Sequence, residues 1–285
     1  MNIKNSQKAG LFALLVLIGL LYIINYPLSI WIASSFPEIE SREYFSFGYW
    51  TIYTFIAYFV VAVCLYVEQD NLEEFHFDKL SLTIFALSGI LIFFEWYELL
   101  SLEKFFHVWI LLPSSLFIFF ILIRKWAYLP NPNWRWVGGS IVVVSLVLIP
   151  ATFIDYWYRH DIVDLSLQGT LENLIARFGT IFMASMIHIV PLEEVLFRGL
   201  LWGYLRRLHW KESKIFVIQA ILFWFIHPQN MVYPLAFFIS LPIGILAISF
   251  LTQRSRQLFP AMVFHILYNS FVSLIWQFLV VLQLL

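Results

Sequence analysis

The sequence is poor in charged residues and in cysteine, and both shortages restrict what the protein can be. Only 12% of its 285 residues are charged, whereas 61% are hydrophobic, and a soluble domain would carry about a quarter charged residues. The single cysteine, Cys64, excludes an internal disulfide and a cysteine-based metal cluster. A formal net charge of −1 gives no indication of a nucleic-acid partner. This composition indicates an integral membrane protein.

Long apolar runs predict an all-α fold, a bundle of eight or nine membrane-spanning helices. A span needs about 20 mostly apolar residues, and fewer where its ends snorkel. The third and seventh runs are short, and they decide between eight spans and nine. We expect helices at residues 9–33, 46–67, 81–94, 105–123, 137–154, 174–207, 214–227, 233–251 and 258–283.

Lysine and arginine are unevenly distributed over the loops between these runs. If the N-terminus is inside, most of them fall in inner loops, as the positive-inside rule requires. The first apolar run exceeds the roughly 7–15 residues of a signal peptide and is expected to be a retained span. We therefore predict that the N-terminus lies on the cytoplasmic side of the membrane. The membrane itself is expected to be the cytoplasmic membrane of a bacterium or archaeon. The inner basic residues are Lys4, Lys8, Lys79, Arg124, Lys125, Arg135, Arg206, Arg207, Lys211, Lys214, Arg254 and Arg256.

Three polar pairs, each with a spacing of four residues, interrupt the apolar runs in the last third of the chain. This spacing places both members of a pair on one helix face. Counted from the basic end of each run, all three lie about 14–20 Å deep, and half the hydrocarbon thickness is about 15 Å. The spacing therefore predicts one shared polar site near the middle of the membrane. The pairs are Glu194 with Arg198, Phe223 with His227, and His265 with Asn269.

Glu193 is an acidic residue that belongs to none of these three pairs. Glu194 and Arg198 have a structural explanation as a buried ion pair, but the residue four positions after Glu193 is a phenylalanine. A carboxylate in a site of low dielectric constant can act as a general base and then as an acid. Glu193 and His227 sharing one water molecule would supply the parts for peptide hydrolysis.

The remaining polar residues of the site allow two kinds of chemistry. His265 and Asn269 could donate hydrogen bonds to an oxyanion. Alternatively, Glu193, His227 and His265 could bind zinc, whose catalytic sites use three N or O ligands and one open position. The sequence has no HExxH motif, and the three ligands would come from three helices. We therefore favour a site without a cofactor and keep zinc as the alternative.

Local features around Pro191 complete this interpretation. Pro191 is expected to interrupt the sixth run and open a fresh helix, so that Glu193 and Glu194 lie in a first turn, where the helix dipole favours carboxylates. His188 either faces the same cavity or caps this break, and we favour a structural role. Glu95 is expected to end the third span at the membrane surface.

Together the three motifs resemble those of the CPBP family, the CAAX proteases and bacteriocin-processing enzymes, also called the Abi family. "EEVLFRG" (193–199) resembles its EExxxR motif, "FWFIH" (223–227) its FxxxH motif and "HILYN" (265–269) its HxxxN motif. The order and the gaps also fit, and the resemblance covers roughly residues 174–275. It implies an all-helical intramembrane endopeptidase within residues 171–285. Residues 1–170, which the apolar runs predict to be transmembrane helices, resemble no named family and have no assigned activity.

The resemblance also implies a role for each matching residue. Glu193 would activate water together with His227, and His265 and Asn269 would form the oxyanion hole. Members have been described both as metalloproteases and as glutamic proteases, and we favour the glutamic type. The implied supporting residues are Glu194, Arg198 and Phe223.

The expected substrate is a hydrophobic or lipidated peptide presented in membrane lipid. Among relatives, eukaryotic members process prenylated CAAX proteins, and bacterial members are linked to bacteriocin maturation and immunity. Two alternatives differ in class: a non-catalytic membrane-binding or immunity protein, and a proton-coupled transporter that relays protons through intramembrane Glu and His. The absence of inverted-repeat symmetry argues against transport. The sequence makes no prediction of an oligomeric state.

Overall fold

The computed structural model describes residues 3–35, 39–99, 108–159, 171–228 and 236–283. Within these ranges the chain is helical and contains no strand. Short π- or 3-10-helical segments, labelled η, join or follow several α-helices. In the N-terminal part the elements are α1 (Ile3–Ile23), η1 (Ile24–Leu28), α2 (Ser29–Ser35), α3 (Ile39–Val67), η2 (Leu72–Phe75), α4 (Lys79–Leu99), α5 (Val108–Lys125) and α6 (Trp134–Arg159).

One long helical stretch, 171–207, opens the C-terminal part and carries the first motif. It is divided into α7 (Leu171–Ala184), η3 (Ser185–Ile189), α8 (Val190–Glu194), η4 (Val195–Leu201) and α9 (Trp202–Arg207). The elements that follow are α10 (Glu212–Phe225), η6 (Ala236–Ser240), α11 (Leu241–Ser255) and α12 (Phe259–Gln283).

The helices agree with the all-α membrane fold predicted from the apolar runs. Each expected run coincides with a helix, although the starts expected at residues 105 and 233 lie outside the described residues. The described chain contains four helical segments long and apolar enough to cross a membrane: Gln7–Ile32, Gly48–Val67, Phe178–Arg207 and Phe237–Ser255. The fold is thus a polytopic helical membrane bundle, while the count of eight or nine spans stays a prediction.

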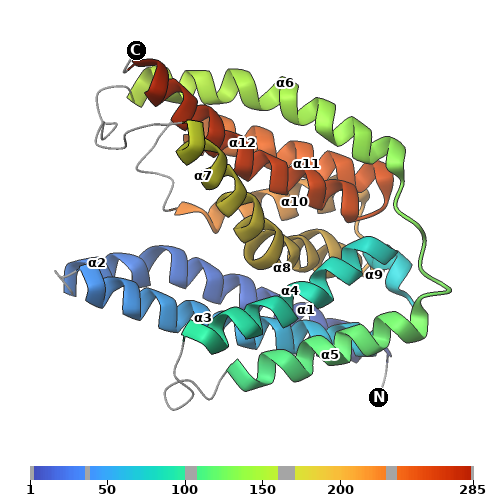
Figure 1. The fold of residues 1–285 in the computed structure, drawn as a ribbon. Coiled ribbons are helices and arrows are strands. Elements are labelled where there is room, and N and C mark those ends of the chain that lie inside the picture. Colours follow the sequence, from blue (N-terminus) through green and yellow to red (C-terminus); the bar gives the residue numbers. More distant parts are fainter. Residues whose placement is uncertain (1–2, 36–38, 100–107, 160–170, 229–235, 284–285) are drawn as a thin grey trace.

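The helices form two groups with the long stretch between them (Figure 1). In one group α3 packs on α1 and α5, and α5 packs on α4; in the other, α12 packs on α6, α7 and α11. The long stretch contacts both groups, because α4 packs on η3 and α8, α1 packs on η4 and α9, and α12 packs on α7 and α8. The beginning of α1 and the end of α12 lie at opposite ends of the bundle (Figure 1). Both motif glutamates therefore lie between the two groups.

Apolar side chains cover the outside of the bundle as well as its interior. Phe12 and Leu146 are both 70% exposed, as expected where lipid rather than water surrounds the helices. Inside, one continuous hydrophobic cluster runs from Leu14 to Ile266 and draws on both groups of helices. Gly203 is required by this packing, since a Cβ atom there would lie 2.1 Å from the ring of Phe75. The protein is an integral membrane protein by these features.

Two ion pairs fix the end of α9 to the loop after α3. Arg207 pairs with the buried carboxylate of Glu68, and its Nε donates to Glu74 Oε2 over 2.6 Å. Glu68 directly follows α3, and Glu74 lies in η2. Arg207 therefore fixes the end of the long stretch at the level where α3 ends.

Arg206, the preceding residue, makes a second set of contacts at this end of the bundle. Its guanidinium donates to Glu212 Oε1 over 2.5 Å and to His76 Nε2 over 2.6 Å. Because a guanidinium only donates, Nε2 of His76 is an acceptor and the imidazole is neutral. Burial, aided by the positive charge of Arg206, lowers the pKa of His76 to about 3. We call these residues (Glu68, Glu74, His76, Arg206, Arg207 and Glu212) the rim network.

Asp78 ties the start of α4 to the start of α12. Its Oδ1 accepts hydrogen bonds from the backbone N–H groups of Leu80 (3.0 Å) and Ser81 (2.9 Å), and its Oδ2 accepts one from Phe259 N–H (2.9 Å). One carboxylate thus caps two helices. Burial raises the pKa of Asp78, although these hydrogen bonds oppose the effect. The contact fixes the origin of α12, the helix that carries His265.

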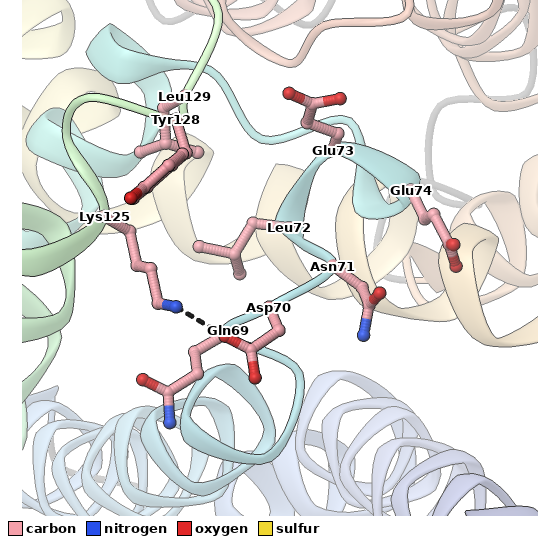
Figure 2. A pocket seen from close by; sticks show the side chains of 9 residues that line it. All are labelled: Gln69, Asp70, Asn71, Leu72, Glu73, Glu74, Lys125, Tyr128 and Leu129. Atoms are coloured by element: carbon pink, nitrogen blue, oxygen red, sulfur yellow. Dashed lines mark hydrogen bonds and ion pairs between the residues drawn. The ribbon is translucent and has the colours of Figure 1, made fainter.

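A polar pocket of about 380 Å³ lies beside the rim network (Figure 2). Lys125 from α5 reaches Asp70 in the α3–η2 loop over 2.5 Å across this pocket. None of its lining residues belongs to the predicted site. They are Gln69, Asp70, Asn71, Leu72, Glu73, Glu74, Lys125, Tyr128 and Leu129.

Candidate active site

The helix that carries the first motif remains helical through Pro191, contrary to the predicted interruption. Ile189 has helical dihedral angles (φ −89°, ψ −62°), and the N–H group of Val190 donates to the carbonyl of Ser185, five residues earlier. A π turn widens the helix, which relieves the clash and the missing donor that a proline brings to an α-helix. The carboxylates of Glu193 and Glu194 are therefore not explained by a free helix N-terminus.

Glu193 lies between two histidines, one that follows the end of α10 and one on α12. Its Oε1 is 3.9 Å from Nε2 of His227, directly after α10, and its Oε2 is 3.8 Å from Nε2 of His265 on α12. The three side chains are 14%, 16% and 7% exposed, in the order Glu193, His227, His265. The predicted meeting of these residues thus occurs, in a mostly buried place that solvent still reaches.

The tautomer of His227 follows from its second ring nitrogen. Nδ1 lies 2.8 Å from the backbone carbonyl of Phe223, one helical turn earlier. A carbonyl only accepts, so Nδ1 carries the proton and donates. In the neutral ring, Nε2 then presents a lone pair toward Glu193.

Glu194, the next residue in the helix, is fully buried together with Arg198. Its Oε1 accepts from Arg198 Nη1 over 3.3 Å and from His265 Nδ1 over 2.8 Å. The ion pair expected from the spacing is therefore present, and a contact to the second histidine adds to it. Glu194 orients His265 as a carboxylate orients a catalytic imidazole, by holding Nδ1.

Phe223 packs against three other residues of the cluster. The guanidinium of Arg198 lies 4.0 Å from the centre of its ring, a distance typical of a cation–π contact. The same ring centre is 4.8 Å from that of His227 and 5.8 Å from that of His265. One buried ring thus packs against both histidines and the arginine, and fixes their mutual positions.

Asn269 lies one turn after His265 on α12 and is partly buried. Its side chain makes no hydrogen bond within the described ranges. The spacing places Asn269 on the same helix face as His265, which agrees with the prediction of a shared face. Its amide is the one predicted site group with no contact to the others.

Several polar atoms of the cluster are buried without a hydrogen-bond partner among the residues that the structure describes. They are Glu193 Oε2, Glu194 Oε2, and Nε and Nη2 of Arg198. Buried polar groups are normally paired, and exceptions at functional sites leave capacity for water or a ligand. The cluster thus retains polar atoms that can still form hydrogen bonds with a water molecule or a ligand.

In the part of the chain that the structure describes, no group of three His, Cys, Asp or Glu side chains is arranged so that it could hold a metal ion. The zinc set Glu193, His227 and His265 therefore does not fit a metal in the geometry observed.

Two residues of the N-terminal helices reach the cluster and were not predicted. Asn25 in η1 donates through Nδ2 to the carbonyl of Ile226 over 2.6 Å, next to His227. Tyr53 in α3 is 3% exposed and lies within electrostatic range of Glu193. A polar residue in the apolar run "IINYPLSI" was a usable signal for Asn25, whereas a tyrosine in an aromatic-rich helix gives none.

His188 is directed away from this cluster. Its Nε2 lies 2.5 Å from Oε2 of Glu95, so that η3 is paired with α4. The contact joins the two groups of helices and agrees with the structural role favoured for His188.

Comparison with known families supports the motif assignment. Residues 175–271 match the family model described as Type II CAAX prenyl endopeptidase Rce1-like. The match covers about a third of the chain, and all three motifs fall within it. Comparisons with curated proteins and with solved structures found no match.

Proposed function

Residues 175–271 carry the core of the CPBP/CAAX protease family, and from this premise we propose that the protein is an intramembrane endopeptidase that uses activated water. Its substrate is a hydrophobic or lipidated peptide in the membrane. One observation carries the proposal: Glu193, with a free carboxylate oxygen, lies 3.8–3.9 Å from the Nε2 atoms of two histidines.

Those gaps suit a water molecule. Direct hydrogen bonds of nitrogen to oxygen span about 2.7–3.2 Å, so Glu193 and His227, with atoms 3.9 Å apart, are not directly bonded. A water offset from the line between them can donate to both Glu193 Oε1 and the lone pair of His227 Nε2. Glu193 then serves as the general base, and His227 orients the second O–H bond.

The hydrolysis balances without a covalent enzyme intermediate. Glu193 takes one proton from the water while the water oxygen forms a bond to the carbonyl carbon of the peptide, and the carbonyl oxygen becomes an oxyanion. When the tetrahedral intermediate collapses, the C–N bond breaks and Glu193 returns its proton to the leaving nitrogen. General base and acid catalysis of this kind contributes about 10²–10⁴ in rate.

The oxyanion requires hydrogen-bond donors, and in this proposal His265 and Asn269 supply them. Nε2 of His265 donates to the oxyanion while Nδ1 stays bonded to Glu194 over 2.8 Å. The Asn269 amide, one turn on, would supply the second donor.

Zinc remains the alternative cofactor, but no step above depends on it. Since the donors do not fit a metal as placed, a zinc enzyme would require His227 and His265 to move around Glu193. Bound zinc would supply Lewis acidity and a lowered pKa of water. Metal content of active protein, together with chelator sensitivity, decides between the two.

The proposed setting is the cytoplasmic membrane of a bacterium or archaeon, with the N-terminus inside. The rim network supports this orientation, because α9, which ends in Arg206 and Arg207, packs against α1 at the end of the bundle where α1 begins (Figure 1). The site lies about 20 Å from that rim at 1.5 Å per residue. A peptide bond must therefore enter the bilayer, as in a lipid-anchored or transmembrane peptide.

Cleavage by the purified protein tests the proposal. Protein in detergent or liposomes is incubated with hydrophobic and prenylated peptides in H₂¹⁸O, and the products are identified by mass spectrometry. We expect cleavage at one bond with ¹⁸O in the new carboxyl group, and loss of cleavage in Glu193→Ala and His227→Ala. Undiminished cleavage by both variants would overturn the mechanism, and no cleavage of any peptide would count against the function.

A further inference from the structure

Tyr53 is a buried polar residue that none of the three motifs includes. It is 3% exposed, and its hydroxyl has no hydrogen-bond partner among the described residues. Its ring is held edge-on against Trp50, with ring centres 5.9 Å apart. A phenylalanine would fill the same space without leaving a buried hydroxyl unpaired, so the hydroxyl itself requires an explanation.

Tyr53 and Glu193 lie at the same depth in the bundle. The ion pair of Glu68 with Arg207 fixes the end of α3 at the level of the end of α9. Tyr53 precedes Glu68 by 15 residues and Glu193 precedes Arg207 by 14. At 1.5 Å per residue, both side chains therefore lie about 20 Å from this shared anchor.

The N-terminal helices also approach the catalytic cluster laterally. α3 packs on α1 and α2. Asn25 lies in η1, which connects α1 to α2, and it donates a hydrogen bond to the carbonyl of Ile226, the residue before His227. Tyr53 and Glu193 are within electrostatic range of one another. Glu193 Oε2 is itself buried without a hydrogen-bond partner in the described chain. Two unpaired buried polar atoms thus lie at one depth and within electrostatic range of one another.

We propose that Tyr53 is a further catalytic residue, whose hydroxyl binds the attacking water held by Glu193. The inference rests on the proposed hydrolysis. The Tyr53 O–H donates to one lone pair of the water, the water donates to Glu193, and the second lone pair is free to attack the carbonyl carbon. Tyr53 keeps its proton throughout, since Glu193 accepts the proton that the water loses. The N-terminal helices thereby complete the active site.

The test is Tyr53→Phe, with Tyr58→Phe as the matched control. Tyr58 is five residues away on α3, is equally buried, and has its hydroxyl bonded to Ser88. We expect Tyr53→Phe to lower kcat about tenfold or more, with KM changed less than about twofold. Its melting temperature should equal or exceed that of the wild type, because no hydrogen bond within the protein is lost. Tyr58→Phe should retain kcat.

An unchanged kcat in Tyr53→Phe, or a change in KM alone, overturns the proposal. The same substitution in a Glu193→Gln background separates this inference from the proposed function. If the two residues share a water, their effects on melting temperature are not additive. That result supports the shared water even in protein that cleaves no peptide, whereas additive shifts overturn it. Absence of cleavage by the wild type counts against the function alone.

Discussion

Two polar clusters in this protein use similar residues in opposite ways. In the rim network, Arg206 and Arg207 each bind several partners, and the carboxylates of Glu68, Glu74 and Glu212 all accept from an arginine. In the deep cluster, four carboxylate and guanidinium atoms of Glu193, Glu194 and Arg198 are buried without a partner within the described chain. In the rim network, Nδ1 of His76 is the one described side-chain atom that is buried without a hydrogen-bond partner.

The difference shows what each cluster is built for. Paired charges at a helix end cross-link α9, α10 and the α3–α4 loop, which is a structural role. Unpaired polar atoms near the middle of a membrane cost free energy, and a fold retains them where they bind something other than the protein itself. The following predictions test this division, from the largest expected effect to the smallest.

Arg198→Met should be the most destabilising change. It leaves the buried carboxylate of Glu194 with His265 as its one described partner, and removing one member of a buried ion pair costs about 3–5 kcal/mol. The measurement is the midpoint of thermal or denaturant unfolding in detergent. Arg206→Met at the rim is the control and should cost less, because the side chain of Glu212, its ion-pair partner, is 43% exposed. Equal losses would contradict the division.

Asn269→Ala should reduce activity without reducing stability. The amide has no hydrogen bond to other described residues, so none is lost, whereas removal of one oxyanion donor lowers kcat about 10²–10³-fold. Steady-state kinetics and a melting curve measure the two quantities. Ser270→Ala, whose hydroxyl bonds only to the carbonyl of Ile266, is the neighbouring control. A destabilised Asn269→Ala with normal kcat would assign Asn269 to packing.

His76→Gln should flatten the dependence of stability on pH. Burial and Arg206 lower the pKa of His76 from about 6.5 to about 3, so between these values the unfolded chain binds the proton and the folded protein does not. Wild-type stability therefore falls as the pH decreases from about 6.5 toward 3. Glutamine can still accept from Arg206 but does not titrate. Between pH 6.5 and about 3, the melting temperature of the wild type should therefore decrease more steeply than that of His76→Gln. Parallel curves for the two proteins would contradict the prediction.

The sequence predicted much of this arrangement because it rests on local rules. Helix positions followed from apolar runs, and the meeting of Glu193, His227 and His265 followed from helix spacing and depth. The sequence did not predict that the helix continues through Pro191. A proline by itself favours a helix break, and the π turn that precedes it depends on tertiary packing. Tyr53 and Asn25 were missed because their partners lie more than 130 residues away in the sequence and their residue types carry no motif. Sequence spacing paired Glu194 with Arg198, but its contact to His265 required the tertiary structure.

The most direct test of the division compares two glutamates, Glu193→Gln in the deep cluster and Glu212→Gln at the rim. Activity and melting temperature are measured for both variants. We predict that Glu193→Gln lowers kcat about 10²–10⁴-fold without lowering the melting temperature. Glu212→Gln, which weakens contacts to Arg206 and Trp202, should lower the melting temperature and retain kcat. Full activity in Glu193→Gln would contradict the account.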